Sequence, residues 1–148
     1  MNLSANFTLE EMLQSQTAVR LDFDEQFSPP ESVRENLKAL CENVLQPIRD
    51  GVDTFITISS GYRCERLNKA IGGADTSQHT KGQAVDCTAQ GMTVEAFYTY
   101  IKQSGVPFDQ LIQEFDKWVH ISYTAVGKNR GECLRAIKVN GQTKYIPD

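Results

Sequence analysis

One stretch of the chain repeats apolar residues at the spacing of an amphipathic helix. Its apolar positions are Val33, Leu37, Leu40, Val44, Leu45 and Ile48. Residues three or four apart share a helix face, so these side chains form one stripe that must be buried, and we expect it to pack on a sheet. Ser28 and two following prolines are expected to start this helix, with Ser28 as its cap. Pro47 conflicts mildly with a helix, so the helix is expected to stop or bend there.

Local signals predict the remaining elements. Thr8 and Glu11 have the spacing of a capping box, which predicts a short helix ending near Ser15. Residues 17–27 mix apolar and acidic side chains without a period and are expected to form a loop. Strands are predicted at 55–58 and 84–88, helices at 66–71 and 93–103, and hairpins with arms at 110–115 and 118–123 and at 133–139 and 142–146.

These elements predict one α+β domain over residues 1–148, with a small, mainly antiparallel sheet and helices packed on one side of it. Apolar residues make up 40% of the chain and charged residues 23%, as in ordinary globular proteins. The net charge of −4 argues against nucleic-acid binding by bulk charge. There is no apolar run of about 20 residues for a membrane helix, and no secretory signal at the N-terminus. We therefore expect a monomer made in the cytoplasm, without nucleic-acid or membrane partners.

The four cysteines are far apart and form no C-x-x-C pair, which disfavours a zinc finger or a thioredoxin-type site. We expect free, partly buried thiols. If one disulfide forms, Cys64 and Cys87 are the best pair, because they flank the histidine motif described next.

The chain contains only two histidines, His79 and His120. Together with Asp86 they would give two imidazoles and one carboxylate, a ligand set that suits a catalytic zinc site with one position left open. His79 falls in a loop where Gly82 lets the backbone turn before the strand that holds Asp86. A single histidine is more often a hydrogen-bonded or exposed residue than a metal ligand, so spacing alone does not decide whether these residues form a zinc site.

Several motifs together resemble a known family. The segment S-x-H-x-x-G-x-A-x-D at 77–86 and W-V-H at 118–120 are similar to the zinc-dependent D-Ala-D-Ala carboxypeptidases and related peptidoglycan peptidases. This fold is shared with phage L-alanyl-D-glutamate endolysins and the hedgehog signalling domain. The small single-domain phage and bacterial branch also shows the motifs found here at 7–10, 44–49, 58–63 and 67–73. The resemblance covers the chain from Phe7 to about Tyr123.

The resemblance implies a Zn²⁺ ion held by His79, Asp86 and His120. Arg63 matches an arginine that the family uses near the zinc, and its fork suits a substrate carbonyl or carboxylate and a developing oxyanion. The alternative for Arg63 is a surface salt bridge. Ser77 matches a serine beside the first ligand, where it either bonds substrate or caps the local turn.

Two aromatic residues, Tyr62 and Trp118, are further candidates for substrate binding. Each could line a groove beside the metal ligands. Each could equally pack in the interior, as aromatic side chains commonly do.

The residues leave more than one candidate for the general base. Better-known members carry an acidic residue three positions before the last histidine, and here that position is Lys117. A loop of residues 116–118 would set Glu114 directly opposite His120, and we favour Glu114 as the base. A two-residue turn would instead pair Gln113 with His120 and leave Glu114 on the other face. Asp116 in the turn, or no competent base at all, remain the alternatives.

The function implied is zinc-dependent hydrolysis of peptide bonds in peptidoglycan stem peptides, of the D-Ala-D-Ala carboxypeptidase or the murein endopeptidase type. Zinc lowers the pKa of its water to about 7, and Glu114 would carry the proton to the leaving amine. The protein would act on the cell wall after release, or as part of a phage. The alternative, which Lys117 favours, is a non-catalytic zinc-containing binding or virion structural module.

Overall fold

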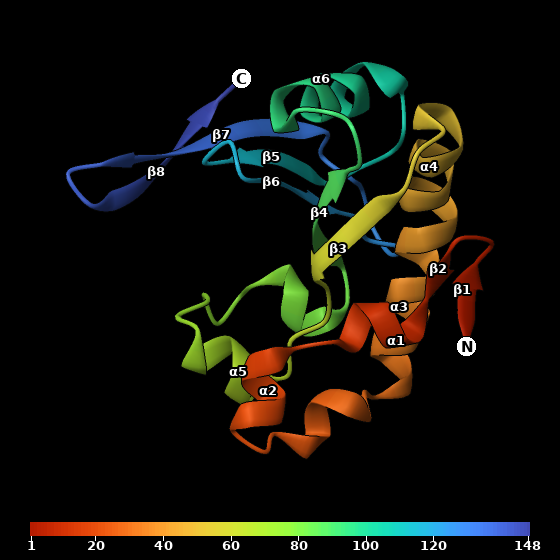
Figure 1. Ribbon diagram of the computed structural model, residues 1–148, viewed down its shortest axis with the longest axis vertical. Coiled ribbons are helices and arrows are strands. Elements are labelled where there is room, and N and C mark those ends of the chain that lie inside the picture. Colours follow the sequence, from red (N-terminus) through yellow and green to blue (C-terminus); the bar gives the residue numbers. More distant parts are fainter.

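A mixed six-stranded sheet forms the centre of the molecule (Figure 1), and the computed structural model describes all 148 residues. From one edge to the other, the strands are β3 (Ile56–Ser60), β4 (Ala84–Ala89), β6 (Trp118–Ser122), β5 (Gln110–Glu114), β7 (Glu132–Val139) and β8 (Gln142–Pro147). A separate two-stranded sheet is formed by β1 (Asn2–Ser4) and β2 (Phe7–Thr8).

The α+β class is confirmed, but the sheet is larger than the small, mainly antiparallel sheet expected, and one parallel pair makes it mixed. All neighbouring strands of the central sheet are antiparallel except β5 and β7, which are parallel. The reason is the connection after β6. Residues 123–131 carry the chain past β5 to its free edge, so the C-terminal hairpin extends the sheet there.

The apolar stripe forms one long helical unit, made of α3 (Glu31–Leu40), a π-helical turn (Cys41–Leu45) and α4 (Gln46–Val52). The chain stays helical past Pro47, so the expected stop there is wrong. The π-helical turn shifts the hydrogen-bond register, and Pro47 falls in the first turn of α4, where a missing N–H is tolerated. The expected cap is also wrong, because Pro30 precedes α3 and no side chain caps it. No helix combines the length and the apolar character needed to cross a membrane.

The short elements follow local signals in some places only. The capping box of Thr8 and Glu11 is confirmed and starts α1 (Leu9–Leu13). The loop expected at 17–27 is wrong, because this segment contains most of α2 (Gln16–Arg20) and a 3-10 turn (Asp24–Phe27). The other short elements are α5 (Glu65–Ala70), a 3-10 turn (Gln78–Lys81) and α6 (Val94–Ser104).

The two faces of the central sheet carry different side chains. On one face, Val85 and Cys87 of β4 and Val119 and Ile121 of β6 are fully buried and join a single apolar cluster with α3, α4 and α6. Figure 1 shows α6 lying over the sheet and the α3–α4 unit beside it. Because side chains alternate along a strand, the residues between them face the opposite side. That opposite face holds the site.

The cysteines form no disulfide bond in this structure. All four are free thiols, and the Cys64–Cys87 disulfide does not form. Burial raises the pKa of Cys41 to about 12, and the pKa of Cys87 is raised for the same reason. Such buried thiols behave as small apolar side chains.

Candidate metal centre

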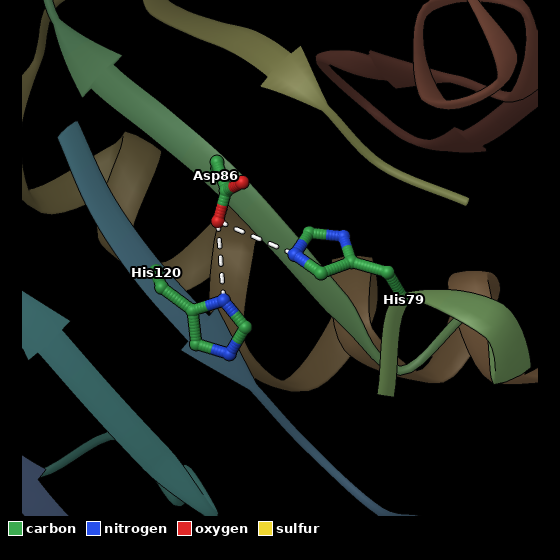
Figure 2. Close-up of side chains that lie close together, drawn as sticks. All are labelled: His79, Asp86 and His120. Atoms are coloured by element: carbon green, nitrogen blue, oxygen red, sulfur yellow. Dashed lines mark hydrogen bonds and ion pairs between the residues drawn. The ribbon is translucent and has the colours of Figure 1, made fainter. Parts of the chain in front are cut away.

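Three side chains from three different elements point at one another on this face of the sheet (Figure 2). Nε2 of His79 lies 3.3 Å from Oδ1 of Asp86, and Nδ1 of His120 lies 3.1 Å from the same oxygen. One ligand atom from each residue lies within 4.8 Å of the others. Asp86 on β4 and His120 on β6 are direct cross-strand partners, so the sheet itself places two members of the group.

The orientation of His79 is fixed by its backbone surroundings. Nδ1 of His79 donates a hydrogen bond to the carbonyl oxygen of Gly61 at 2.7 Å, which leaves Nε2 free to face Asp86. The hydroxyl of Ser77 accepts a hydrogen bond from the backbone N–H of His79 at 3.2 Å, so Ser77 caps this turn. The turn ends at Gly82 with φ of 72°, where a Cβ atom would lie 2.8 Å from a backbone oxygen of α3.

The charge state of Asp86 suits metal binding. Burial alone would raise the pKa of Asp86, but hydrogen bonds from His120 and His79 and their nearby charge outweigh it and hold that pKa well below its usual range. Asp86 is therefore an ionised carboxylate, with two imidazole nitrogens aimed at one of its oxygens. Deprotonated carboxylate and imidazole nitrogen are the donors that zinc accepts, so the three residues fit a zinc ion.

Arg63 is built into the site rather than paired at the surface. Its side chain is only 14% exposed, and Nη2 lies 3.4 Å from Oδ2 of Asp86. Nε donates to the hydroxyl of Ser60 at 3.1 Å, and Nη1 to Oδ1 of Asn68 at 3.3 Å. The backbone N–H of Arg63 also donates to the carbonyl oxygen of His79 at 3.0 Å. The segments that carry Arg63 and His79 are thus hydrogen-bonded to each other.

Glu114 lies on the same sheet face as His120, although the turn before β6 differs from the expected one. The loop consists of residues 115–117, so Glu114 pairs with Trp118, and Ile112 pairs with His120. The expected direct pairing of Glu114 with His120 is therefore wrong. Because the loop lies one position earlier than expected, the register of the two strands differs by two residues. A shift by two residues keeps Glu114 on the face of His120, and its Oε1 lies 4.0 Å from Nδ1 of His120.

The alternative base, Asp116, is not brought to the group. Its carboxylate accepts a hydrogen bond from Nε2 of Gln113 at 3.1 Å. Gln113 belongs to the opposite face of β5, where it also donates to Glu95 of α6 at 3.2 Å. Asp116 therefore lies on the helix side of the sheet, away from His120.

The chain that carries this group of side chains matches a known protein family. A family model described as Peptidase M15 matches residues 5–122, which include all the residues above. The chain belongs to the Peptidase M15 family. M15 peptidases are zinc enzymes, and the His79, Asp86 and His120 group is placed to bind a metal. No curated protein matches the chain.

Two depressions meet at Arg63 of this M15 chain, with volumes of about 740 Å³ and 710 Å³. The first is lined by His79, His120 and Glu114, and Ser77 lies on its wall. The second is lined by residues that include Asp86, Trp118 and Tyr62. Arg63 therefore belongs to the walls of both depressions at the M15 site.

Tyr62 belongs mainly to the interior. It is 7% exposed and joins the apolar cluster, while its backbone N–H donates to Met12 at 2.9 Å. Trp118 is less buried, and its indole Nε1 donates to Oε1 of Glu114 at 2.8 Å. Of the two aromatic candidates, Trp118 is the one tied to a site residue.

Sequence reasoning missed Gln26, a fully buried amide behind the Arg63 turn. Nε2 of Gln26 donates to the carbonyl oxygens of Leu13 and Tyr62, at 2.9 Å and 2.8 Å, and Oε1 accepts from the backbone N–H of Cys64 at 2.8 Å. The segment lacks a period, and only tertiary contacts give this glutamine its role.

Asp109 was missed as well. Its buried carboxylate accepts hydrogen bonds from Nη2 of Arg130 at 2.8 Å and from Nε2 of Gln78 at 3.2 Å. The Asp109 carboxylate thereby joins the loop of residues 123–131 to Gln78, the residue before His79. These partners are far apart in the sequence, so no local signal could have found them.

Proposed function

We propose that this M15 chain hydrolyses peptide bonds in peptidoglycan stem peptides with the help of a zinc ion. The observation that carries the proposal is the convergence of a two-histidine, one-carboxylate group, a carboxylate and a guanidinium on one open sheet face. Each is a group that metal-assisted amide hydrolysis needs.

His79, Asp86 and His120 would hold the zinc. Zinc bound there supplies Lewis acidity, which polarises the scissile carbonyl and makes water more acidic. Glu114 accepts the proton of the attacking water and delivers it to the leaving amine.

Two further residues assist these steps. The Trp118 indole holds one carboxylate oxygen of Glu114 in place. The fixed guanidinium of Arg63 binds the substrate carbonyl and stabilises its developing negative charge.

The shape of the cleft favours cleavage within a peptide over removal of a terminal residue. Two depressions of similar volume share Arg63 in their walls, so the chain of a substrate has room to continue from one into the other. A carboxypeptidase needs a cation for the free terminal carboxylate. Two arginines line these depressions. Arg63 is taken by the scissile carbonyl, and Arg130 is paired with Asp109, so neither is left for a terminal carboxylate.

The alternative is a zinc-containing binding or virion structural module without turnover. Lys117, in the position where better-known relatives carry an acid, is the observation that favours it. The orientation of Glu114 toward His120 supports the enzyme instead, because it supplies a carboxylate from the preceding strand.

The test is to incubate zinc-loaded protein with purified peptidoglycan and to identify the released peptides by mass spectrometry. We expect new internal termini that a chelator abolishes, and no loss of single terminal D-alanine. Glu114→Gln should abolish cleavage while retaining zinc, and Asp116→Asn is the matched control that should cleave normally. A zinc-loaded protein that releases nothing from several wall types would support the non-catalytic module.

A further inference from the structure

The C-terminal hairpin β7–β8 lies outside the residues that match the M15 family model, yet it borders the metal-site cleft. The match ends at residue 122, and the hairpin begins at Glu132. Leu134 of β7 and Tyr145 of β8 nevertheless line the same depression as His79, His120 and Glu114. This chain therefore adds a wall to the cleft from residues that the family model does not include.

Strand register explains how the hairpin reaches the cleft. Glu114 pairs with Ala136 across β5 and β7, and Ala136 pairs with Tyr145 across β7 and β8. Directly paired residues share a sheet face, so Glu114, Ala136 and Tyr145 form one row on the site face. Strands lie about 4.8 Å apart, which puts the backbones of Tyr145 and Glu114 about 10 Å apart.

The middle position of this row is occupied by a small residue. Ala136 is only 1% exposed and does not line the depression, so Tyr145 and Glu114 are the members of the row that reach it. The Tyr145 side chain and the Glu114 carboxylate thus border one depression. A peptide lying in it has an aromatic wall on one side and the carboxylate on the other.

Tyr145 is available to a ligand. It is 55% exposed, and its hydroxyl makes no hydrogen bond within the chain. An exposed aromatic ring with a polar tip offers apolar contact and a hydrogen bond together, which is the usual role of tyrosine at binding surfaces.

The hairpin is held firmly enough to act as a wall. Oη of Tyr98, on α6, donates to Oδ2 of Asp148 at 2.7 Å, and Nε of Arg135 lies 3.2 Å from the same oxygen. Arg135 also binds both oxygens of Glu95 at 2.7 Å. These contacts fasten the start of β7 and the residue after β8 to the helix on the far side of the sheet.

We propose that the β7–β8 hairpin is a substrate-binding wall of the cleft, and that Tyr145 contacts the bound stem peptide through its ring and its hydroxyl. This inference rests on the proposed function. Tyr145 acts in binding, and the proton transfer stays with Glu114. The hairpin thereby adds selectivity for the peptide on its side of the scissile bond.

The test compares Tyr145→Ala with Lys144→Ala, a matched control at the adjacent exposed position, which faces the opposite side of β8. Cleavage of a purified stem peptide gives kcat and KM. Binding of the same peptide is measured by calorimetry in a zinc-loaded Glu114→Gln background. We expect Tyr145→Ala to raise KM and Kd about tenfold, a change of about 1.4 kcal/mol, with kcat and zinc content nearly unchanged. Lys144→Ala should match the parent protein.

Two further variants keep the result interpretable. Tyr145→Phe keeps the ring and should raise Kd by a few-fold, because it removes only the hydroxyl contact. If Tyr145→Ala does not fold, Tyr145→Leu replaces it, with a raised Kd again expected. Unchanged KM and Kd in these variants, beside a parent protein that cleaves, would overturn the hairpin proposal alone. A parent protein that neither cleaves nor binds the stem peptide would overturn the proposed function, and this inference with it.

Discussion

The indole Nε1 of Trp118 donates a hydrogen bond to Oε1 of Glu114 at 2.8 Å, between two residues that are direct cross-strand partners. The same oxygen lies 4.0 Å from Nδ1 of His120. The tryptophan therefore holds the carboxylate at a set distance from the proposed metal ligands, as the proposed role of Glu114 requires.

Replacing Trp118 by Phe keeps a ring in place and removes this hydrogen bond. A bond to a charged group is worth roughly 1.5–3 kcal/mol, so we expect kcat to fall about tenfold or more. KM and bound zinc should stay near the parent values, because no ligand is changed. Steady-state kinetics and metal analysis check this, and an unaltered kcat would show that Glu114 does not depend on the indole.

Removing one metal ligand should abolish zinc binding. We expect His120→Ala to lose most of its bound zinc, because two remaining ligands hold the ion far more weakly than three. Zinc should raise the melting temperature of the parent protein and leave that of the variant unchanged, since a ligand stabilises only the state that binds it. Ser77→Ala, which changes only a turn cap, should still bind zinc. A variant that kept full zinc content would contradict the ligand set.

Acid should destabilise the protein in part through Asp109. Hydrogen bonds from Arg130 lower the pKa of the Asp109 carboxyl in the folded state. A carboxyl with a depressed folded pKa contributes stability that is present above its unfolded pKa of about 3.9 and lost as the pH falls further. Asp109→Asn should therefore lower stability at neutral pH and flatten its decline in acid. Urea unfolding between about pH 7 and pH 2 measures this, and an unchanged slope would speak against it.

Gln26 should stabilise the fold, and its loss should also free the backbone on both sides of Arg63. Gln26→Leu leaves two buried carbonyl oxygens and one N–H without partners, at roughly 1–3 kcal/mol each before relaxation. We expect a net loss of about 3 kcal/mol in the free energy of unfolding, measured by urea denaturation. Gln103→Leu, at an exposed position of α6, is the control and should change stability little.

Elements with strong local signals could be predicted from the sequence. The capping box at Thr8 forms, and so does the hairpin predicted at 133–146. Its two connecting residues, Asn140 and Gly141, both have the positive φ that such a turn requires. The position of the 115–117 loop was predicted wrongly because Phe115 and Asp116 adopt φ of 59° and 57°. Residues other than glycine rarely adopt such values, so the sequence contains no signal for this turn. The position of β7 beside β5 was also beyond prediction, because parallel pairing depends on contacts remote in the sequence.

The same division applies to the candidate site. Family motifs mark His79, Asp86, His120 and Arg63, because their residue types and spacing recur. Ser77 is a turn cap in the structure, and whether it also binds substrate stays a prediction. Tyr145 carries no such mark, since its place depends on the register of two strands that join the sheet late in the chain.

The parallel pairing of β5 and β7 also sets an order of assembly. All three proposed metal ligands and Glu114 precede residue 123, whereas the β7–β8 hairpin follows it. During synthesis from the N-terminus, β5 and β6 leave the ribosome before β7, so the β5–β7 pair can form only after the proposed site residues have been synthesised. The nascent chain therefore gains its reactive groups before it gains the surface that would choose among substrates.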